Sequence, residues 1–184
     1  ALPSITGYSS EMIRQGIPEV LAPFRKESLL QVLRSELRDP LVLDEFRPKG
    51  SAPGQTRAYG PRLTTHIFSG NIPALPVSSL IYALLAKSAC LGKLASGEPL
   101  MACLFARTLA AIDPRMAESI AILPWKGGSR RVEREAFAIS DAVIAYGDDA
   151  SLEGIASRLP AGVRFLGYGS SISFGIIARE ALSK

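Results

Sequence analysis

The feature that most limits how this chain can fold is an alternation of short apolar segments with longer helical patterns, which starts at Leu63 and continues to Leu182. The apolar segments end in glycine or small polar residues, which is typical of buried strands. Strands that alternate with helices form parallel sheets with helices on both faces. The alternation therefore predicts a doubly wound α/β domain with a five-stranded parallel sheet, its strands at residues 63–68, 90–94, 119–123, 141–146 and 164–168.

The segments between and after these strands carry the helical patterns. Pro99 suits the first turn of one such helix, because a proline at that position sacrifices no intrahelical hydrogen bond. The last pattern follows the fifth strand and closes the chain. The predicted helices cover residues 77–87, 99–112, 131–139, 150–158 and 174–182.

The chain before residue 60 follows a different pattern. Residues 1–23 contain scattered prolines and glycines, which indicates an irregular arm with a short helix near residues 11–15. Apolar residues at helical spacing predict an amphipathic helix at 24–37, and Asp39-Pro40 ends it. Residues 47–61 hold three prolines and three glycines, as a linker does. We therefore predict an N-terminal helical arm and linker at 1–60 and a ligand-binding domain at 61–184.

Composition narrows the class of protein. A chain of 184 residues is long enough for one domain with a sizeable core, and a hydrophobic fraction of 47% excludes a disordered chain. No apolar run reaches the length of a transmembrane segment. The mean hydropathy of +0.20 has two interpretations: strands that are apolar on both faces, or apolar surface that a partner or another domain covers.

The net charge of +4 is a mild excess that suits an anionic small ligand, such as a phosphate-bearing cofactor. The chain has no dense basic stripe with interleaved aromatic residues, so we expect no nucleic-acid partner. Arg130, Arg131 and Arg134 alternate with Glu133 and Glu135. Such alternation predicts a solvated helix face.

The two cysteines, Cys90 and Cys103, lack CxxC spacing and stand in apolar runs. They are predicted to be buried structural thiols in a protein of the reducing cytoplasm. A single histidine and no ligand cluster argue against a zinc site, so no metal is expected. The first residues lack the basic and apolar regions of a signal peptide.

The ends of the predicted strands are the candidate site, because open α/β sheets bind ligands at the carboxyl ends of their strands. Ser69, Gly70 and Asn71 follow the first strand. After the last strand, residues 167–171 read Gly-Tyr-Gly-Ser-Ser and lead into a helix, whose N-terminal N–H groups favour a phosphate. The alternative is that these glycines only turn the chain. Neither G-x-G-x-x-G after the first strand nor a P-loop is present, which disfavours a standard Rossmann dehydrogenase.

Six motifs in order resemble one family. From about residue 29 to its end, the chain is similar to the LuxC-like acyl-CoA reductases, the fatty-acid reductases of bacterial bioluminescence, within the aldehyde dehydrogenase superfamily. The resemblance implies a Rossmann-like cofactor domain of the aldehyde dehydrogenase type. The motifs are HIFSGNIP at 66–73, LLAKSA at 84–89, GKLAS at 92–96, ILPWKGG at 122–128, DAVIAYG at 141–147 and RFLGYG at 164–169.

The family implies roles for individual residues. Asn71 matches the asparagine whose amide helps to hold the oxyanion of a tetrahedral intermediate; alternatively, it only shapes a turn. Lys93 matches a lysine that contacts the adenosine ribose, and Gly169 and Ser170 resemble the turn that faces the pyrophosphate. Ser96 stands where a glutamate would bind the ribose 2′-hydroxyl. Because a carboxylate there would repel a 2′-phosphate, its absence permits NADP(H), which the resemblance also suggests.

The leading hypothesis is the cofactor-binding portion of an NADPH-dependent reductase that converts long-chain fatty acyl-CoA to fatty aldehyde. The family uses a cysteine nucleophile from a catalytic domain that we expect to be absent from this chain, because Cys90 and Cys103 match the wrong segments. The expected partners are acyl-CoA and that catalytic domain, and homo-oligomerisation stays open. The alternatives are an aldehyde-oxidising dehydrogenase of the same superfamily and a non-catalytic nucleotide-binding or assembly module. Acyl chain length and physiological direction stay open as well.

Overall fold

The computed structural model describes residues 2–70, 74–170 and 175. Its centre is a parallel sheet of five strands in the order β5-β4-β3-β6-β7. All five predicted strands are confirmed, with ends that differ by a residue at most. The strands are β3 (Leu63–Ile67), β4 (Ala89–Lys93), β5 (Ile120–Leu123), β6 (Ala142–Tyr146) and β7 (Arg164–Tyr168).

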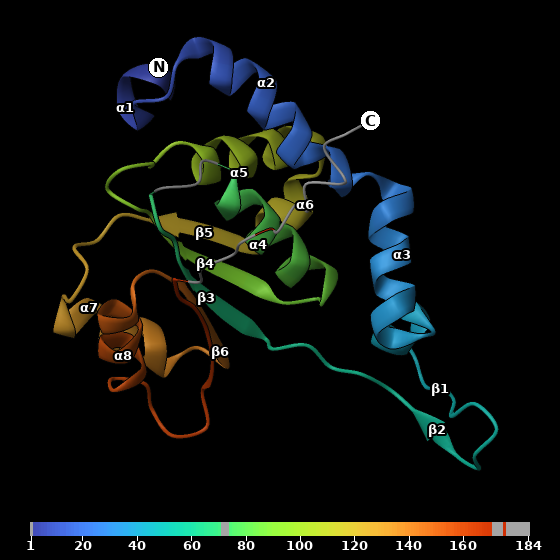
Figure 1. Cartoon of the computed structure of the whole chain (residues 1–184). Helices are drawn as coiled ribbons and strands as arrows, with labels where there is room; N and C mark the ends of the chain where they lie inside the picture. Colours follow the sequence, from blue (N-terminus) through green and yellow to red (C-terminus); the bar gives the residue numbers. More distant parts are fainter. Residues whose placement is uncertain (1, 71–73, 171–174, 176–184) are drawn as a thin grey trace.

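The order of the strands reverses at β3. The chain first builds outward through β4 to β5, and then returns to the other side of β3 to add β6 and β7. Because parallel crossovers are right-handed, this reversal puts the first helices on one face of the sheet and the later ones on the other (Figure 1). The helices are α4 (Leu75–Leu85), α5 (Met101–Ile112), α6 (Pro114–Ala117), α7 (Arg130–Ala138) and α8 (Asp149–Ala156). The predicted helix at 174–182 lies outside the described residues.

Two apolar clusters form the core, one on each face of the sheet. On the α4 and α5 face, Phe68 and Leu80 pack with Cys90 and Ala102. On the α7 and α8 face, Phe137 packs with residues of the inner strands. Of the two interpretations of the high mean hydropathy, the one with strands that are apolar on both faces therefore holds for the inner strands. Their apolar residues are buried on both sides of the sheet.

The central strand β3 also carries polar side chains, and its two buried threonines each pair with a serine hydroxyl. Buried hydroxyl pairs join Thr64 to Ser88 on the α4 side at 2.8 Å and Thr65 to Ser140 on the α7 side at 2.7 Å. At the amino end of β3, the Asp141 carboxylate accepts hydrogen bonds from two successive backbone N–H groups at 2.8 and 3.1 Å. These contacts hold β3 to both neighbouring layers, because an unpaired buried polar group would cost stability.

The arm is more regular than predicted. The expectation of an irregular segment with a short helix near 11–15 is wrong, because α2 runs from Ser10 to Leu21 and follows a short α1 (Leu2–Thr6). The Ser9 side chain caps α2 by accepting from the Met12 N–H at 3.1 Å, and the helix accommodates Pro18 near its end. The next helical pattern is confirmed as α3 (Lys26–Leu37), which follows the short 3₁₀ turn η1 (Ala22–Phe24).

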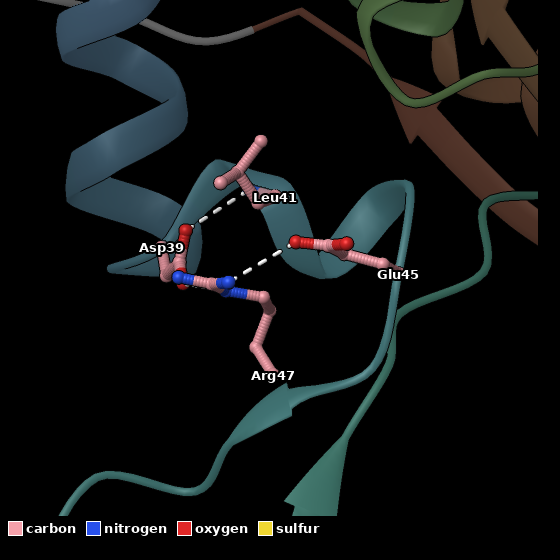
Figure 2. A network of polar contacts seen from close by, with 4 residues as sticks. All are labelled: Asp39, Leu41, Glu45 and Arg47. Carbon is pink, nitrogen blue, oxygen red and sulfur yellow. Dashed lines mark hydrogen bonds and ion pairs between the residues drawn. The ribbon is translucent and has the colours of Figure 1, made fainter.

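The segment after α3 is held by a small polar network (Figure 2). Asp39 caps the 3₁₀ turn η2 (Pro40–Leu43) by accepting from the Leu41 N–H at 3.1 Å. Arg47 donates to Asp39 at 2.8 Å and to Glu45 at 3.0 Å. The hydrogen bond from Arg47 holds the pKa of Asp39 below its usual value. Within the predicted linker, β1 (Arg47–Pro48) and β2 (Gln55–Thr56) then form a two-residue antiparallel ladder.

The arm and linker contact the sheet's first helix. The Phe24 and Tyr82 rings meet edge to face with centroids 5.8 Å apart. Lys87, just beyond α4, forms an ion pair with Asp44 at 2.9 Å. No helix in the described residues has the length and hydropathy that a bilayer-spanning segment requires.

Candidate functional site

A cleft of about 550 Å³ opens at the carboxyl edge of the sheet, where the strand order reverses. This is the place at which doubly wound sheets bind nucleotides. Loops after three strands meet there, so residues far apart in the sequence share one cavity. The lining residues are Ser69, Gly70, Leu75, Tyr146, Gly147, Asp148, Tyr168, Gly169 and Ser170. Four predicted site residues are therefore brought together: Ser69, Gly70, Gly169 and Ser170.

Two stacked tyrosines form one wall of this cleft. Tyr146 and Tyr168 are register partners at the ends of β6 and β7, and their rings lie 5.0 Å apart at an angle of 14°. The Tyr146 hydroxyl donates to Ser79 of α4 at 3.2 Å, which fixes its ring. Burial raises the pKa of Tyr146, so this hydroxyl is protonated at neutral pH. The wall therefore offers an apolar ring surface of the kind that packs against a base or a nicotinamide.

The loops after β3 and β4 touch through their glycines. A Cβ atom on Gly70 would lie 3.0 Å from the Gly97 Cα and 3.3 Å from the Glu98 backbone nitrogen. Only glycine at position 70 permits this backbone contact without a shift. Asn71, the predicted oxyanion donor, comes next in the chain and lies outside the described residues.

Lys93 ends β4 and is 8% exposed. It follows the core residue Leu91 by two positions, so it faces the α7 side of the sheet. Burial lowers the pKa of Lys93, and the charge of Glu133 partly opposes that change. Within the described part of the chain, the Lys93 ammonium makes no hydrogen bond or ion pair. It is a desolvated cation at the ligand edge, on the other face from the tyrosine wall.

Ser96 is exposed in the loop after β4 and does not line the cleft. The nearest carboxylate in sequence, Glu98, turns inward and is 1% exposed. Its Oε1 accepts from the backbone N–H groups of Leu100 and Met101 at 2.9 Å each, and so caps α5. Glu98 is therefore used inside the fold, and the exposed side chain at position 96 is a serine hydroxyl and not a carboxylate.

The prediction that α7 presents only a solvated charged face is wrong for Glu133, which is 3% exposed. Its carboxylate accepts from the Gly128 N–H at 2.8 Å and pairs with Arg158 at 2.8 Å. Gly128 adopts a φ of 78°, which a side chain would strain. The helical period places Glu133 on the same face as Phe137, which faces the core. Glu133 therefore ties the loop after β5 to Arg158, which lies just beyond the end of α8.

The surroundings of Gly169 and Ser170 are partly acidic. The predicted helix after them lies outside the described residues, so the helix N-terminus seen at this cleft belongs to α8. Asp148 caps α8 by accepting from the Ser151 N–H at 2.7 Å. A Cβ atom on Gly169 would lie 2.7 Å from the Asp149 carboxylate. The carboxylates of Asp148 and Asp149 favour ligand groups that donate hydrogen bonds, such as hydroxyl groups. They would repel a phosphate at this corner.

Sequence reasoning missed Tyr146, Tyr168 and Asp148 as cleft residues. The signal was available for the tyrosines, because each is the last residue of a predicted strand. Their stacking depended on β6 and β7 being neighbours in register, which the sequence order alone leaves open.

The sequence matches the family described as acyl-CoA reductase (LuxC) over residues 1–184. It is 26% identical over 181 residues to a long-chain acyl-protein thioester reductase of Vibrio harveyi and 28% identical over 186 residues to one of Aliivibrio fischeri. These alignments cover 95% and 96% of this chain but 37% of each relative. The chain thus spans little more than a third of the length of these curated relatives.

A solved structure of PutA from Anabaena variabilis, named as an aldehyde dehydrogenase, resembles this fold. The TM-score is 0.58 over 85% of this chain and 32% of that one, at 19% identity, so the likeness is one of fold. The sheet order, the cleft at its reversal and the match along all 184 residues agree with the six motifs read from the sequence. The chain belongs to the LuxC family of acyl-CoA reductases.

Proposed function

We propose that this chain is the NADP(H)-binding part of an enzyme that reduces a long-chain fatty acyl thioester, such as acyl-CoA, to a fatty aldehyde. The observation that carries the proposal is the family match over residues 1–184. The curated relatives are named for reduction of acyl-protein thioesters, which share the thioester bond with acyl-CoA.

The described residues fit a dinucleotide. The cleft lies where doubly wound sheets bind nucleotides, Gly70 and Gly97 let two loops approach closely, and Lys93 offers an unpaired cation beside the same edge. Lys93 would contact the adenosine ribose, Ser69 and Gly70 would line the site, and the exposed Ser96 leaves room for a 2′-phosphate. The family motif proposes Gly169 and Ser170 for the pyrophosphate, whereas the carboxylates of Asp148 and Asp149 beside them oppose an anion there. NADPH, when bound, supplies the hydride that reduces the acyl carbon.

Neither cysteine of this chain suits the role of nucleophile. Burial raises the pKa of Cys90 to about 12, so its thiol stays protonated, and the side chain is 1% exposed. Cys103 lies on α5, away from the residues that line the cleft. We propose that a cysteine elsewhere in the longer protein attacks the thioester carbonyl, releases the thiol of CoA and carries the acyl group to the hydride donor.

A direct assay tests this proposal. The full-length protein should form long-chain aldehyde from long-chain acyl-CoA with NADPH, and should do so less effectively with NADH. If aldehyde is instead oxidised without any requirement for CoA, the aldehyde-oxidising dehydrogenase is the correct alternative. Nucleotide binding without turnover in either direction would favour the non-catalytic module.

Asn71 is the proposed oxyanion donor, because it follows β3 in the sequence, in a motif that resembles the superfamily's asparagine motif. A donor that acts in the transition state affects turnover more than binding. Asn71→Ala in the full-length enzyme should therefore lower kcat by about 10²–10³ and leave NADPH affinity nearly unchanged. If the variant melts much earlier yet turns over normally at low temperature, Asn71 only shapes the turn.

A further inference from the structure

A basic groove lies between α7 and the end of α8, outside the cleft already described. Its volume is about 670 Å³, and it is lined by Arg130, Arg131, Arg134, Ser157 and Arg158. Four guanidinium groups and a hydroxyl line the groove: three of the arginines belong to α7, and Ser157 and Arg158 directly follow α8. Arginine is the side chain best suited to bind phosphate, because its planar fork donates two parallel hydrogen bonds.

The charges in the groove are only partly compensated. Arg158 pairs with the buried Glu133 at 2.8 Å, and Arg131 pairs with Glu135 at 3.7 Å. In the described part of the chain, neither Arg130 nor Arg134 has a carboxylate partner. The groove therefore keeps two uncompensated positive charges, which match the charge of a phosphate monoester near neutral pH.

The groove adjoins the proposed nucleotide site. Arg130 and Arg131 begin α7, which starts from the loop at the carboxyl end of β5, so they lie at the same edge of the sheet as Lys93. Glu133 links the two places, because it pairs with Arg158 in the groove and its charge acts on Lys93. The Arg158 guanidinium lies along α8, where its Nη1 would be 3.4 Å from a Cβ atom on Gly154.

We infer that this groove binds the 2′-phosphate of NADPH, with Arg130 and Arg134 as the residues that select NADPH over NADH. The inference rests on the proposed function. It is consistent with an adenosine ribose at Lys93, because Lys93 itself faces the side of the sheet that α7 covers. The acidic corner at Asp148 and Asp149 makes the main cleft a poor site for the same dianion.

The test compares nucleotides that differ only in one phosphate. NADPH and NADH are titrated into the full-length protein, and 2′,5′-ADP, 3′,5′-ADP and 5′-AMP are used as competitors. The main variant combines Arg130→Ala with Arg134→Ala. A second variant, Arg134→Lys, keeps the positive charge but lacks the two parallel donors of the guanidinium group. Arg115→Ala is the control, since Arg115 is an exposed arginine on α6, which packs against α5 on the other helical layer.

The double variant should lose about 10-fold or more of its affinity for NADPH and 2′,5′-ADP, the effect of removing charge-assisted hydrogen bonds. Its affinity for NADH and 5′-AMP should change less than about 2-fold, and Arg115→Ala should bind as the unaltered protein does. Equal losses for NADPH and NADH, or no loss, would overturn the inference while leaving the proposed function intact. A loss confined to 3′,5′-ADP would assign the groove to the phosphate of CoA and overturn it too. If the unaltered protein binds neither NADPH nor NADH, the proposed function itself fails.

Discussion

At the scale of single residues, His66 is a buried group whose pKa is strongly lowered. It is fully buried in β3, its Nδ1 lies 2.8 Å from the Ser79 hydroxyl, and burial lowers its pKa to about 4. It is also the one histidine among the 184 residues. Between pH 6.5 and pH 4, the unfolded chain therefore binds a proton at His66 that the folded protein does not bind.

The free energy of unfolding should consequently decrease as the pH drops from about 6.5 to 4, with roughly 3 kcal/mol of the decrease due to His66. Above about pH 6.5 this contribution to stability is fully present. The His66→Gln variant removes this titration. The difference in melting temperature between the unaltered protein and His66→Gln should be largest near pH 7 and should shrink towards pH 4. A difference that stays constant with pH would show that His66 is not desolvated.

Lys93 is the residue through which the cofactor proposal can be tested most directly. Lys93→Ala should weaken NADPH binding by about 1–3 kcal/mol, the range for losing a hydrogen bond to a charged group. Lys26→Ala, which removes an exposed lysine from α3, is the matched control and should leave affinity unchanged. Unchanged affinity in Lys93→Ala, or a clear preference for NADH in the unaltered protein, would contradict the assignment.

At the scale of elements, the contact between the loops after β3 and β4 decides the shape of the ligand edge. Gly70→Ala would place a methyl group against backbone atoms of Gly97 and Glu98, which cannot rotate away. We expect a loss of about 1–3 kcal/mol of stability, as in overpacked cores, together with weaker nucleotide binding.

Gly127→Ala is the control for this substitution, because a Cβ atom on Gly127 meets nothing within 4 Å. Thermal unfolding and nucleotide titration of both variants provide the measurement. If Gly70→Ala and Gly127→Ala have the same thermal stability and the same nucleotide affinity, the close approach of the two loops is not required for either property.

At the scale of the whole molecule, the position of the nucleophile can be tested with the two thiols. The 184-residue chain alone should form no aldehyde from acyl-CoA, because Cys90 is buried and protonated. In the native chain, a thiol reagent should modify the partly exposed Cys103 and spare Cys90. Aldehyde formation by this chain that is lost in Cys90→Ala or Cys103→Ala would place the nucleophile here after all.

Much of the α/β part could be predicted from sequence, because strand and helix periodicities are local. Residues 63–67 alternate between two buried faces, and Gly or small polar residues mark the strand ends. The arm was harder to predict. Pro18 and the surrounding glycines suggested irregular chain, whereas the Ser9 cap and an apolar stripe sustain α2.

The sequence by itself determined the alternation of strands and helices, the family and the cluster of small residues at the strand ends. Only the tertiary structure decided that Tyr146 stacks on Tyr168, that Glu133 is buried between Gly128 and Arg158, and that four arginines share one groove. The physical reason is that periodicity reports the face on which each side chain lies. The lateral order of the strands and the partners of buried charges depend on contacts between segments that lie far apart in the chain.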